Sequence, residues 1–186
     1  MSDPSKTRWQ KIARRIRVPL GFAVAAVFLV FAAPSLHSLA WSLPLVITGV
    51  WLRGYAAGYV RKNSELTQTG PYAYTRNPLY LGSMVMAFGF AAASRSLWIT
   101  LFLALLFLLI YAPTIYSEEQ FLRSTFPGFE SYARRVPRLL PRLRPARFAG
   151  DGGFSVALYR KHREYNSFLG ACAIYAVLVA ALWIRH

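Results

Sequence analysis

The sequence has few of the residues that usually build a catalytic centre in a soluble enzyme. Its single cysteine, Cys172, lies in an apolar stretch, which excludes a disulfide framework and a cysteine-based metal site and indicates a small buried hydrophobe. The three histidines, His37, His162 and His186, are scattered, so they predict no metal cluster, histidine base or nucleophile dyad. No strand pattern is present, and no phosphate-binding loop follows a strand. Any chemistry must therefore need little acid–base assistance.

Charged residues are also scarce. They make up 16% of the 186 residues, whereas 55% are hydrophobic, and the mean hydropathy is +0.33. This composition is too apolar for an ordinary soluble domain and predicts an integral membrane protein. The net charge of +15 could suggest a nucleic-acid partner. The basic residues lie beside apolar runs, however, and not on a separable basic domain, so we expect no nucleic acid to bind.

Long uncharged runs predict an all-α, polytopic membrane fold with about five transmembrane helices and a cytosolic cofactor pocket. Residues 18–52 carry no charge and are too long for one span, and Pro34 and Pro44 divide them between two helices. A tight turn at residues 94–96 separates the next two. The predicted spans are residues 18–34, 38–60, 79–93, 97–117 and 167–184. We expect the first to be a retained signal-anchor, because apolar sequence continues past the small residues that could form a cleavage site.

These spans divide the chain into four predicted parts. A basic cytosolic tail (1–17) precedes the membrane core (18–142), which comprises four spans and a cytosolic flap. A linker (143–166) then leads to an additional C-terminal transmembrane helix (167–186). The arginines of the flap and linker are by default contacts to anionic lipid. Prolines at 137, 141 and 145 prevent a long helix there, so we expect an extended flap over the cytosolic mouth.

The basic residues predict the orientation. On this topology 19 of the 22 lysines and arginines lie on one side, together with all seven acidic residues. Because basic loops remain in the cytoplasm, we predict a bacterial inner-membrane protein whose N-terminus and active site are cytoplasmic. Every polar feature then faces the compartment that holds diffusible cofactors.

The start of the third predicted span is the most informative segment. This span has about 15 residues, roughly 23 Å, and is shorter than a hydrocarbon core of about 30 Å, so its N-terminus should be recessed. Pro78 suits a first helical turn and Asn77 can cap it, which would direct free N–H groups and a positive dipole end into a cavity suited to an anion. A plain helix cap is the simpler alternative. Gly82 would allow a helix or a ligand to approach closely.

Arg53 and the Glu118-Glu119 pair are the charges nearest to this start. Arg53 lies about two turns inside the second predicted span, so it either extends to the cytosolic face or pairs with a buried anion. Candidates for that anion are Glu118, Glu119 and a ligand carboxylate. The two glutamates follow a helix whose dipole disfavours negative charge at its C-terminus, so a cation should lie nearby unless the helix continues. Two solvated glutamates are the simpler alternative.

Two linked motifs resemble a known family. Gly70-Pro71-Tyr72 and then Arg76-Asn77-Pro78-Leu79-Tyr80-Leu81-Gly82 are similar to the Arg-His-Pro-x-Tyr-x-Gly signature of the isoprenylcysteine carboxyl methyltransferase and phospholipid methyltransferase group. The downstream residues that keep the family's order are Glu118, Glu119, Phe126, Tyr132, Arg135, Val136 and Pro137. The resemblance covers about residues 45–141. Two positions depart from it: Asn77 replaces the family histidine and cannot titrate, and Pro127 replaces a glycine.

The resemblance implies an S-adenosylmethionine-dependent methyltransferase with a lateral opening for a lipophilic acceptor. Methyl transfer to a nucleophile that is already anionic chiefly requires alignment and a dry site. The implied cofactor-binding residues are Arg76, Asn77, Pro78, Tyr80, Gly82, Glu118, Glu119 and Tyr132. Arg53 and Arg135 are the expected catalytic residues, and no metal is expected.

Two other functions remain open at this stage. A membrane sterol-type reductase has a C-terminal half that resembles this fold, but it uses NADPH and would need a larger anion-binding surface. A non-enzymatic helical membrane scaffold would not need Glu118 and Glu119. The acceptor is equally open among a prenylated cysteine carboxylate, a phospholipid amine, a thiol and an isoprenoid acid, as is the oligomeric state.

Overall fold

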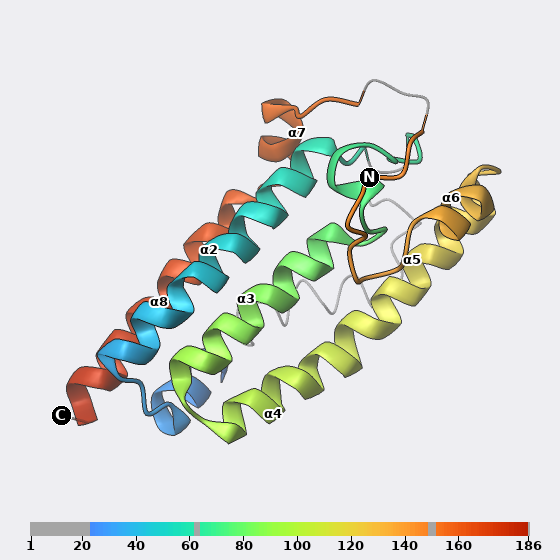
Figure 1. Ribbon diagram of the computed structural model, residues 1–186. Coiled ribbons are helices and arrows are strands. Elements are labelled where there is room, and N and C mark those ends of the chain that lie inside the picture. Colours follow the sequence, from blue (N-terminus) through green and yellow to red (C-terminus); the bar gives the residue numbers. More distant parts are fainter. Residues whose placement is uncertain (1–22, 62–63, 149–151, 186) are drawn as a thin grey trace, which may run out of the picture.

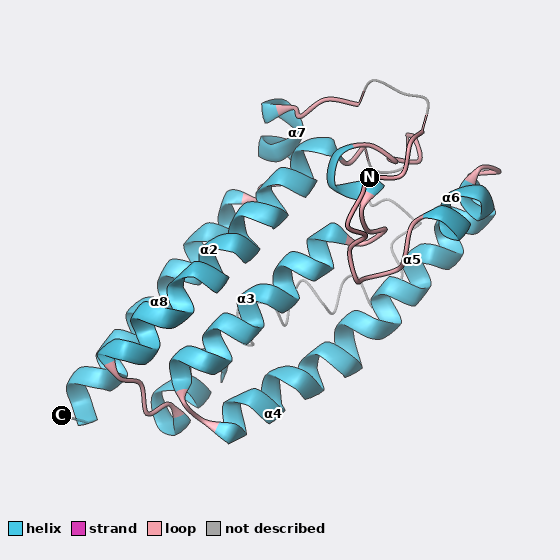
Figure 2. Cartoon of the chain, viewed as in Figure 1, coloured by secondary structure: helices cyan, strands magenta, loops and turns pink. Residues whose placement is uncertain are grey.

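The computed structural model describes residues 23–61, 64–148 and 152–185. All regular structure in this part of the chain is helical, which confirms the predicted all-α class for it (Figure 2). Residues 23–31 form a first helix. The other elements are α2 (Leu36–Tyr59), η1 (Gly70–Ala73), α3 (Pro78–Ser94), α4 (Leu97–Leu106), η2 (Phe107–Tyr111), α5 (Ala112–Thr125), α6 (Phe129–Arg135), α7 (Val156–Lys161) and α8 (Tyr165–Arg185). The predicted basic tail and the start of the first predicted span lie outside the described residues.

The long helices run side by side, with α3 between α2 and the continuous α4–η2–α5 rod (Figure 1). α8 packs against both α2 and α3. The core between these helices includes Phe28, Val46, Phe90 and Leu178, each nearly fully buried. The short elements η1, α6 and α7 gather at one end of the bundle, near the start of α3 and the end of α5.

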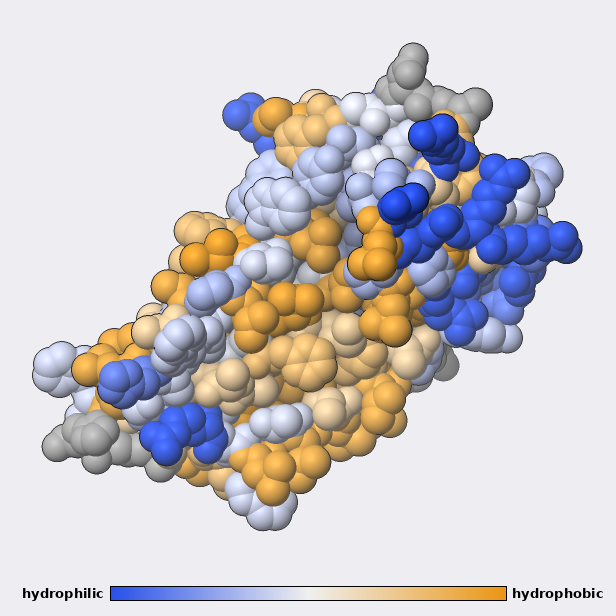
Figure 3. Space-filling model, viewed as in Figure 1, coloured by the Kyte–Doolittle hydropathy of each residue, from blue (hydrophilic) through white to orange (hydrophobic). Residues whose placement is uncertain are grey.

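Two helices are long and apolar enough to cross a membrane. They are Leu97–Thr125, with 29 residues, and Tyr165–Ile184, with 20, while Pro78–Ser94 is a shorter apolar helix. Large apolar side chains such as Leu105, Leu108 and Leu109 are exposed on the rod. Figure 3 shows apolar side chains covering the middle of the visible face, with hydrophilic ones gathered around the α5–α6 end. The number of spans and the cytoplasmic orientation stay predictions.

Local sequence signals explain where these helices begin and end. The Ser35 hydroxyl accepts a hydrogen bond from the Ser38 amide, and the Ser38 hydroxyl accepts one from the Ser35 amide, so the two form a capping box that starts α2. Pro44 lies within α2 and does not end it. The predicted turn after α3 is present, since Arg95 adopts a left-handed conformation with φ of 51° and Ser96 caps α4.

Close packing of α2 on α3 depends on two glycines. A Cβ atom at Gly49 would lie 2.6 Å from the Gly82 carbonyl oxygen, and one at Gly82 would lie 2.8 Å from the Gly49 carbonyl oxygen. A Cβ at Gly82 would also lie 2.7 Å from Cγ of Arg53. The two backbones are therefore in direct contact, and Gly82 allows Arg53 to pass beside α3.

Candidate active site

A cavity of about 320 Å³ lies where α3 begins and α5 runs past it. Its walls come from α2, the segment that follows α2, η1, the first turn of α3, α5, α6 and the segment between α7 and α8. Of the residues expected from the sequence, those that line it are Arg53, Arg76, Asn77, Pro78, Tyr80, Glu118 and Tyr132. Gly82, Glu119 and Arg135 lie outside this lining.

Glu119 is buried beneath the cavity and held by the protein itself. Its carboxylate lies 2.9 Å from Nη2 of Arg138 and 3.5 Å from Nη2 of Arg76, and it accepts a hydrogen bond from Nδ2 of Asn77 at 3.4 Å. The side chain is 5% exposed. Two guanidinium groups and an amide thus satisfy this carboxylate, which ties α5 to the start of α3 and to the segment that follows α6.

Glu118 has a different environment, because consecutive residues on a helix point about 100° apart. It lines the cavity beside the Tyr80 hydroxyl. Among the described residues, no lysine, arginine or histidine forms an ion pair with it. The adjacent glutamates therefore separate into one carboxylate inside the scaffold and one at the cavity wall.

The anion that neutralises Arg53 is Glu164, at 2.6 Å from Nε to Oε1. Arg53 thus pairs with an anion of the protein, but that anion is neither Glu118 nor Glu119, the two candidates from the protein that the sequence suggested. Nε of Arg53 also donates to Ser167 at 3.0 Å, and Nη1 donates to the Leu79 carbonyl at 3.3 Å and to the Ser83 hydroxyl. Glu164 directly precedes α8, so this cluster joins α2, α3 and α8 at the cavity wall.

Asn77 does not cap α3 with its side chain, contrary to the sequence-based expectation. Its Nδ2 instead donates to the Arg138 carbonyl at 2.8 Å, in addition to its contact with Glu119. The two amides that follow Pro78, those of Leu79 and Tyr80, therefore receive no cap from Asn77, and both residues line the cavity.

Arg76 contributes an unsatisfied donor. Its Nε is buried without a hydrogen-bond partner, and its guanidinium carbon lies 5.8 Å from the centre of the Phe129 ring. Since an unpaired buried donor is costly, this atom indicates a position for an acceptor group.

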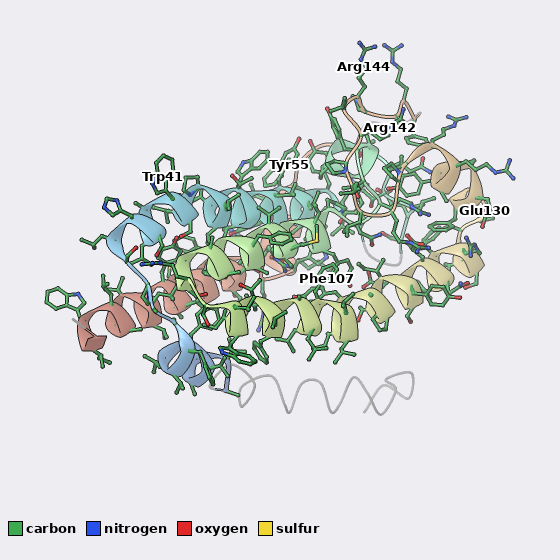
Figure 4. The ribbon with its side chains drawn as sticks, turned by 60° about the horizontal axis from the view of Figure 1, so that its bottom comes forward. Trp41, Tyr55, Phe107, Glu130, Arg142 and Arg144 are labelled. Carbon is green, nitrogen blue, oxygen red and sulfur yellow. The ribbon has the colours of Figure 1, made fainter. Side chains whose placement is uncertain are left out.

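The segment after α6, residues 136–148, contains no helix, as its prolines predicted, but it bends at several positions and is not uniformly extended. It is hydrogen-bonded to residues 73–76. Its backbone contacts with this loop are Arg76 N to Pro137 O, Arg142 N to Tyr74 O and Ala146 N to Ala73 O, each at 3.0 Å. Figure 4 shows this segment, with Arg142 and Arg144, at the end of the bundle opposite Trp41. Arg135, just before it, is exposed and stacks on Phe148, with 5.7 Å from the guanidinium carbon to the ring centre.

Two buried tyrosines form the inner wall. The Tyr132 hydroxyl donates to the Tyr72 carbonyl at 2.8 Å. Burial raises the pKa of Tyr132, against the opposing effect of Arg76, and burial raises the pKa of Tyr72 with a further contribution from Tyr132. Both phenols therefore stay neutral well above neutral pH.

Several residues that line the cavity had no signal in the sequence. They are Arg61, Glu65, His162 and Glu164. α7 packs against the end of α2 and brings His162 there, where its Nδ1 lies 3.1 Å from the Ala57 carbonyl oxygen (Figure 1). Positions separated by more than a hundred residues meet here, which no local motif reveals. In the described part of the chain, no three histidine, cysteine, aspartate or glutamate side chains form a group that could hold a metal ion.

The described part of the chain is a helical protein with apolar outer surfaces and a cavity with polar lining residues at one end. Residues 48–128 match the phospholipid methyltransferase family, which confirms the resemblance. No solved structure matches the chain significantly.

Three relatives show similarity to parts of the chain. The cobalt-zinc-cadmium resistance protein CzcN of Cupriavidus metallidurans is 41% identical over 55% of this chain, and the nickel-cobalt-cadmium resistance protein NccN of Alcaligenes xylosoxydans xylosoxydans is 43% identical over 50%. The protein-S-isoprenylcysteine O-methyltransferase of Schizosaccharomyces pombe is 28% identical over 70%. The chain spans roughly half the length of these relatives, at 52%, 43% and 58%.

Proposed function

We propose that this protein is a membrane methyltransferase that transfers a methyl group from S-adenosylmethionine to a lipophilic acceptor. The observation that carries the proposal is a single cavity lined by both Arg76 and Glu118. Nε of Arg76 is buried without a hydrogen-bond partner, and Glu118 has no ion-pair partner among the described residues. The match of residues 48–128 to the phospholipid methyltransferase family supports the same reaction class.

The residues that line this cavity fit S-adenosylmethionine as the methyl donor. Its carboxylate needs donors, which Arg76 and the first free amides of α3 supply, and its amino end needs an anion, which Glu118 supplies. The volume of about 320 Å³ lies in the range of about 300–1,000 Å³ that is usual for ligand pockets. When bound, S-adenosylmethionine supplies a methyl group on a positively charged sulfur. The chain orients it, and the neutral Tyr72 and Tyr132 help to exclude water.

A second cavity supports a lipophilic acceptor. It has a volume of about 280 Å³ and lies between α3, the α4–η2 part of the rod and α8, with a mainly apolar lining that includes Met86, Phe90 and Leu103. Arg53 lines both cavities. An apolar chain in the second cavity would therefore direct its polar end toward Arg53 and the first cavity, and in this role Arg53 positions the acceptor. Arg135 lines neither cavity and has no proposed contact with the reacting groups.

Calorimetric titration of the detergent-solubilised protein separates this proposal from its alternatives. We expect micromolar binding of S-adenosylmethionine and no binding of NADPH. Arg76→Gln should weaken the binding, whereas Arg134→Gln, at an exposed position outside the cavity, should not. Binding of NADPH alone would indicate a reductase, and binding of neither would indicate a scaffold.

Mass spectrometry would then identify the acceptor. It would compare lipids from cells with and without the protein and search for species that have gained one CH₂ unit.

A further inference from the structure

His162 is an ionisable side chain in the cavity wall that the proposed function has not used. It follows α7 and lies outside residues 48–128, the part that matches the family. His162 lies far from the other two histidines in the sequence, so the sequence alone gave no reason to consider it as a base. The packing of α7 against α2 places it among the residues that line the cavity.

One hydrogen bond fixes the tautomer of this imidazole. Nδ1 lies 3.1 Å from the carbonyl oxygen of Ala57, and a carbonyl oxygen can only accept a hydrogen bond. Nδ1 therefore carries the proton in the neutral ring. Nε2 is left with a free lone pair that points away from Ala57, which is the form required of a general base.

Of the three carboxylates that line the cavity, Glu118 is assigned to the amino end of the methyl donor, and the other two are already paired. Glu164 accepts from Arg53 and Ser167, and Glu65 lies 3.4 Å from Arg61. A carboxylate is also a poorer match than an imidazole to a thiol, because the pKa of an imidazole lies closer to that of a thiol.

We propose that His162 is a catalytic general base and that the acceptor is therefore a lipophilic thiol, which still carries its proton when it binds. This inference rests on the proposed function. As the acceptor sulfur forms its bond to the methyl carbon, its S–H proton passes to Nε2. The carbon–sulfur bond of the donor breaks, and its electron pair stays on the donor sulfur, which becomes a neutral thioether. The imidazolium then releases the proton to water.

This step requires a free lone pair on Nε2 of His162, so the rate should rise with pH as that atom loses its proton. The charged groups that share the cavity with His162, and whose fields act on it, are Arg53, Arg61, Glu65, Arg76, Glu118 and Glu164. Lys161 and Arg163 are its exposed neighbours in the chain.

The test compares two acceptors of equal chain length, dodecanethiol and dodecanoate, with labelled S-adenosylmethionine and the full-length solubilised protein. His162→Asn keeps a donor for the Ala57 carbonyl but has no base. We expect this variant to lose about 100-fold or more of the thiol methylation rate at neutral pH and to bind S-adenosylmethionine normally. The rate of thiol methylation by this variant should be proportional to the fraction of the acceptor that is already ionised to thiolate. It should therefore keep rising above pH 8. His37→Asn, on the exposed side of α2, should match the unaltered protein.

Each other outcome has a defined meaning. Unchanged thiol methylation and an unchanged pH profile in His162→Asn would overturn the role of His162. Methylation of dodecanoate alone by the unaltered protein would overturn the thiol assignment and leave the proposed function standing. Failure of the unaltered protein to bind S-adenosylmethionine would remove both. If His162→Asn proves unstable, His162→Ala with added imidazole decides the question: restored thiol methylation supports the inference, and no restoration contradicts it.

Discussion

Glu118 and Glu119 are adjacent in sequence, yet one faces the cavity and the other is bound within the scaffold. We expect Glu118→Gln to weaken S-adenosylmethionine binding by about 10-fold or more, because a charged hydrogen bond contributes about 1.5–3 kcal/mol. Calorimetric titration measures this change. Glu130→Gln, an exposed glutamate outside the cavity, is the matched control. Equal affinity in both variants would exclude Glu118 from the binding site.

Glu119→Gln should instead lower stability. The substitution leaves Arg76 and Arg138 without their shared anion, and breaking a fully buried pair costs about 3–5 kcal/mol. The Arg138 side chain is 55% exposed, so we expect a smaller loss of about 1–3 kcal/mol in the free energy of unfolding. Thermal unfolding in detergent measures this loss. A melting temperature equal to that of Glu118→Gln would contradict the structural role assigned to Glu119.

At the scale of elements, the contact between α2 and α3 sets the position of Arg53. Gly82→Ala would place a Cβ 2.8 Å from the Gly49 carbonyl oxygen, so the two helices must separate. We expect a clear fall in melting temperature together with weaker ligand binding, since Arg53 would also be displaced. Gly170→Ala in α8 is the control, because a Cβ there meets no atom within 4 Å. Because alanine favours a helix more than glycine does, Gly170→Ala should not lower the melting temperature. An unchanged or higher melting temperature in Gly82→Ala would contradict the role assigned to the close contact.

The elements were largely predictable from the sequence, whereas several contacts of the site were not. Long uncharged runs in the sequence indicated α2, α3, the α4–α5 rod and α8, because apolar helices of this length contain few charged residues. The side-chain role of Asn77 was missed because capping was inferred from local sequence alone. Glu164 and His162 were missed because their neighbours belong to α2, more than a hundred residues away. Long-range packing of this kind leaves no local pattern.

At the scale of the whole molecule, the distribution of basic residues predicts one orientation. Cysteine labelling in a Cys172→Ser background tests it. Ser64→Cys, near the cavity end, should react with a membrane-impermeant maleimide only after the membrane is opened, whereas Leu97→Cys, at the start of α4, should react in intact spheroplasts. Both positions are exposed, so access to the side chain itself does not limit the reaction. The reverse pattern would place the cavity on the outer face.

Arg53 forms part of the walls of both cavities, and its pairing with Glu164 lies where the two approach each other. A water-soluble reactant in the first cavity and a lipid-soluble one in the second would thus both lie next to the Arg53 side chain. Two compounds that dissolve in different media could then react, and neither would have to leave the medium it prefers.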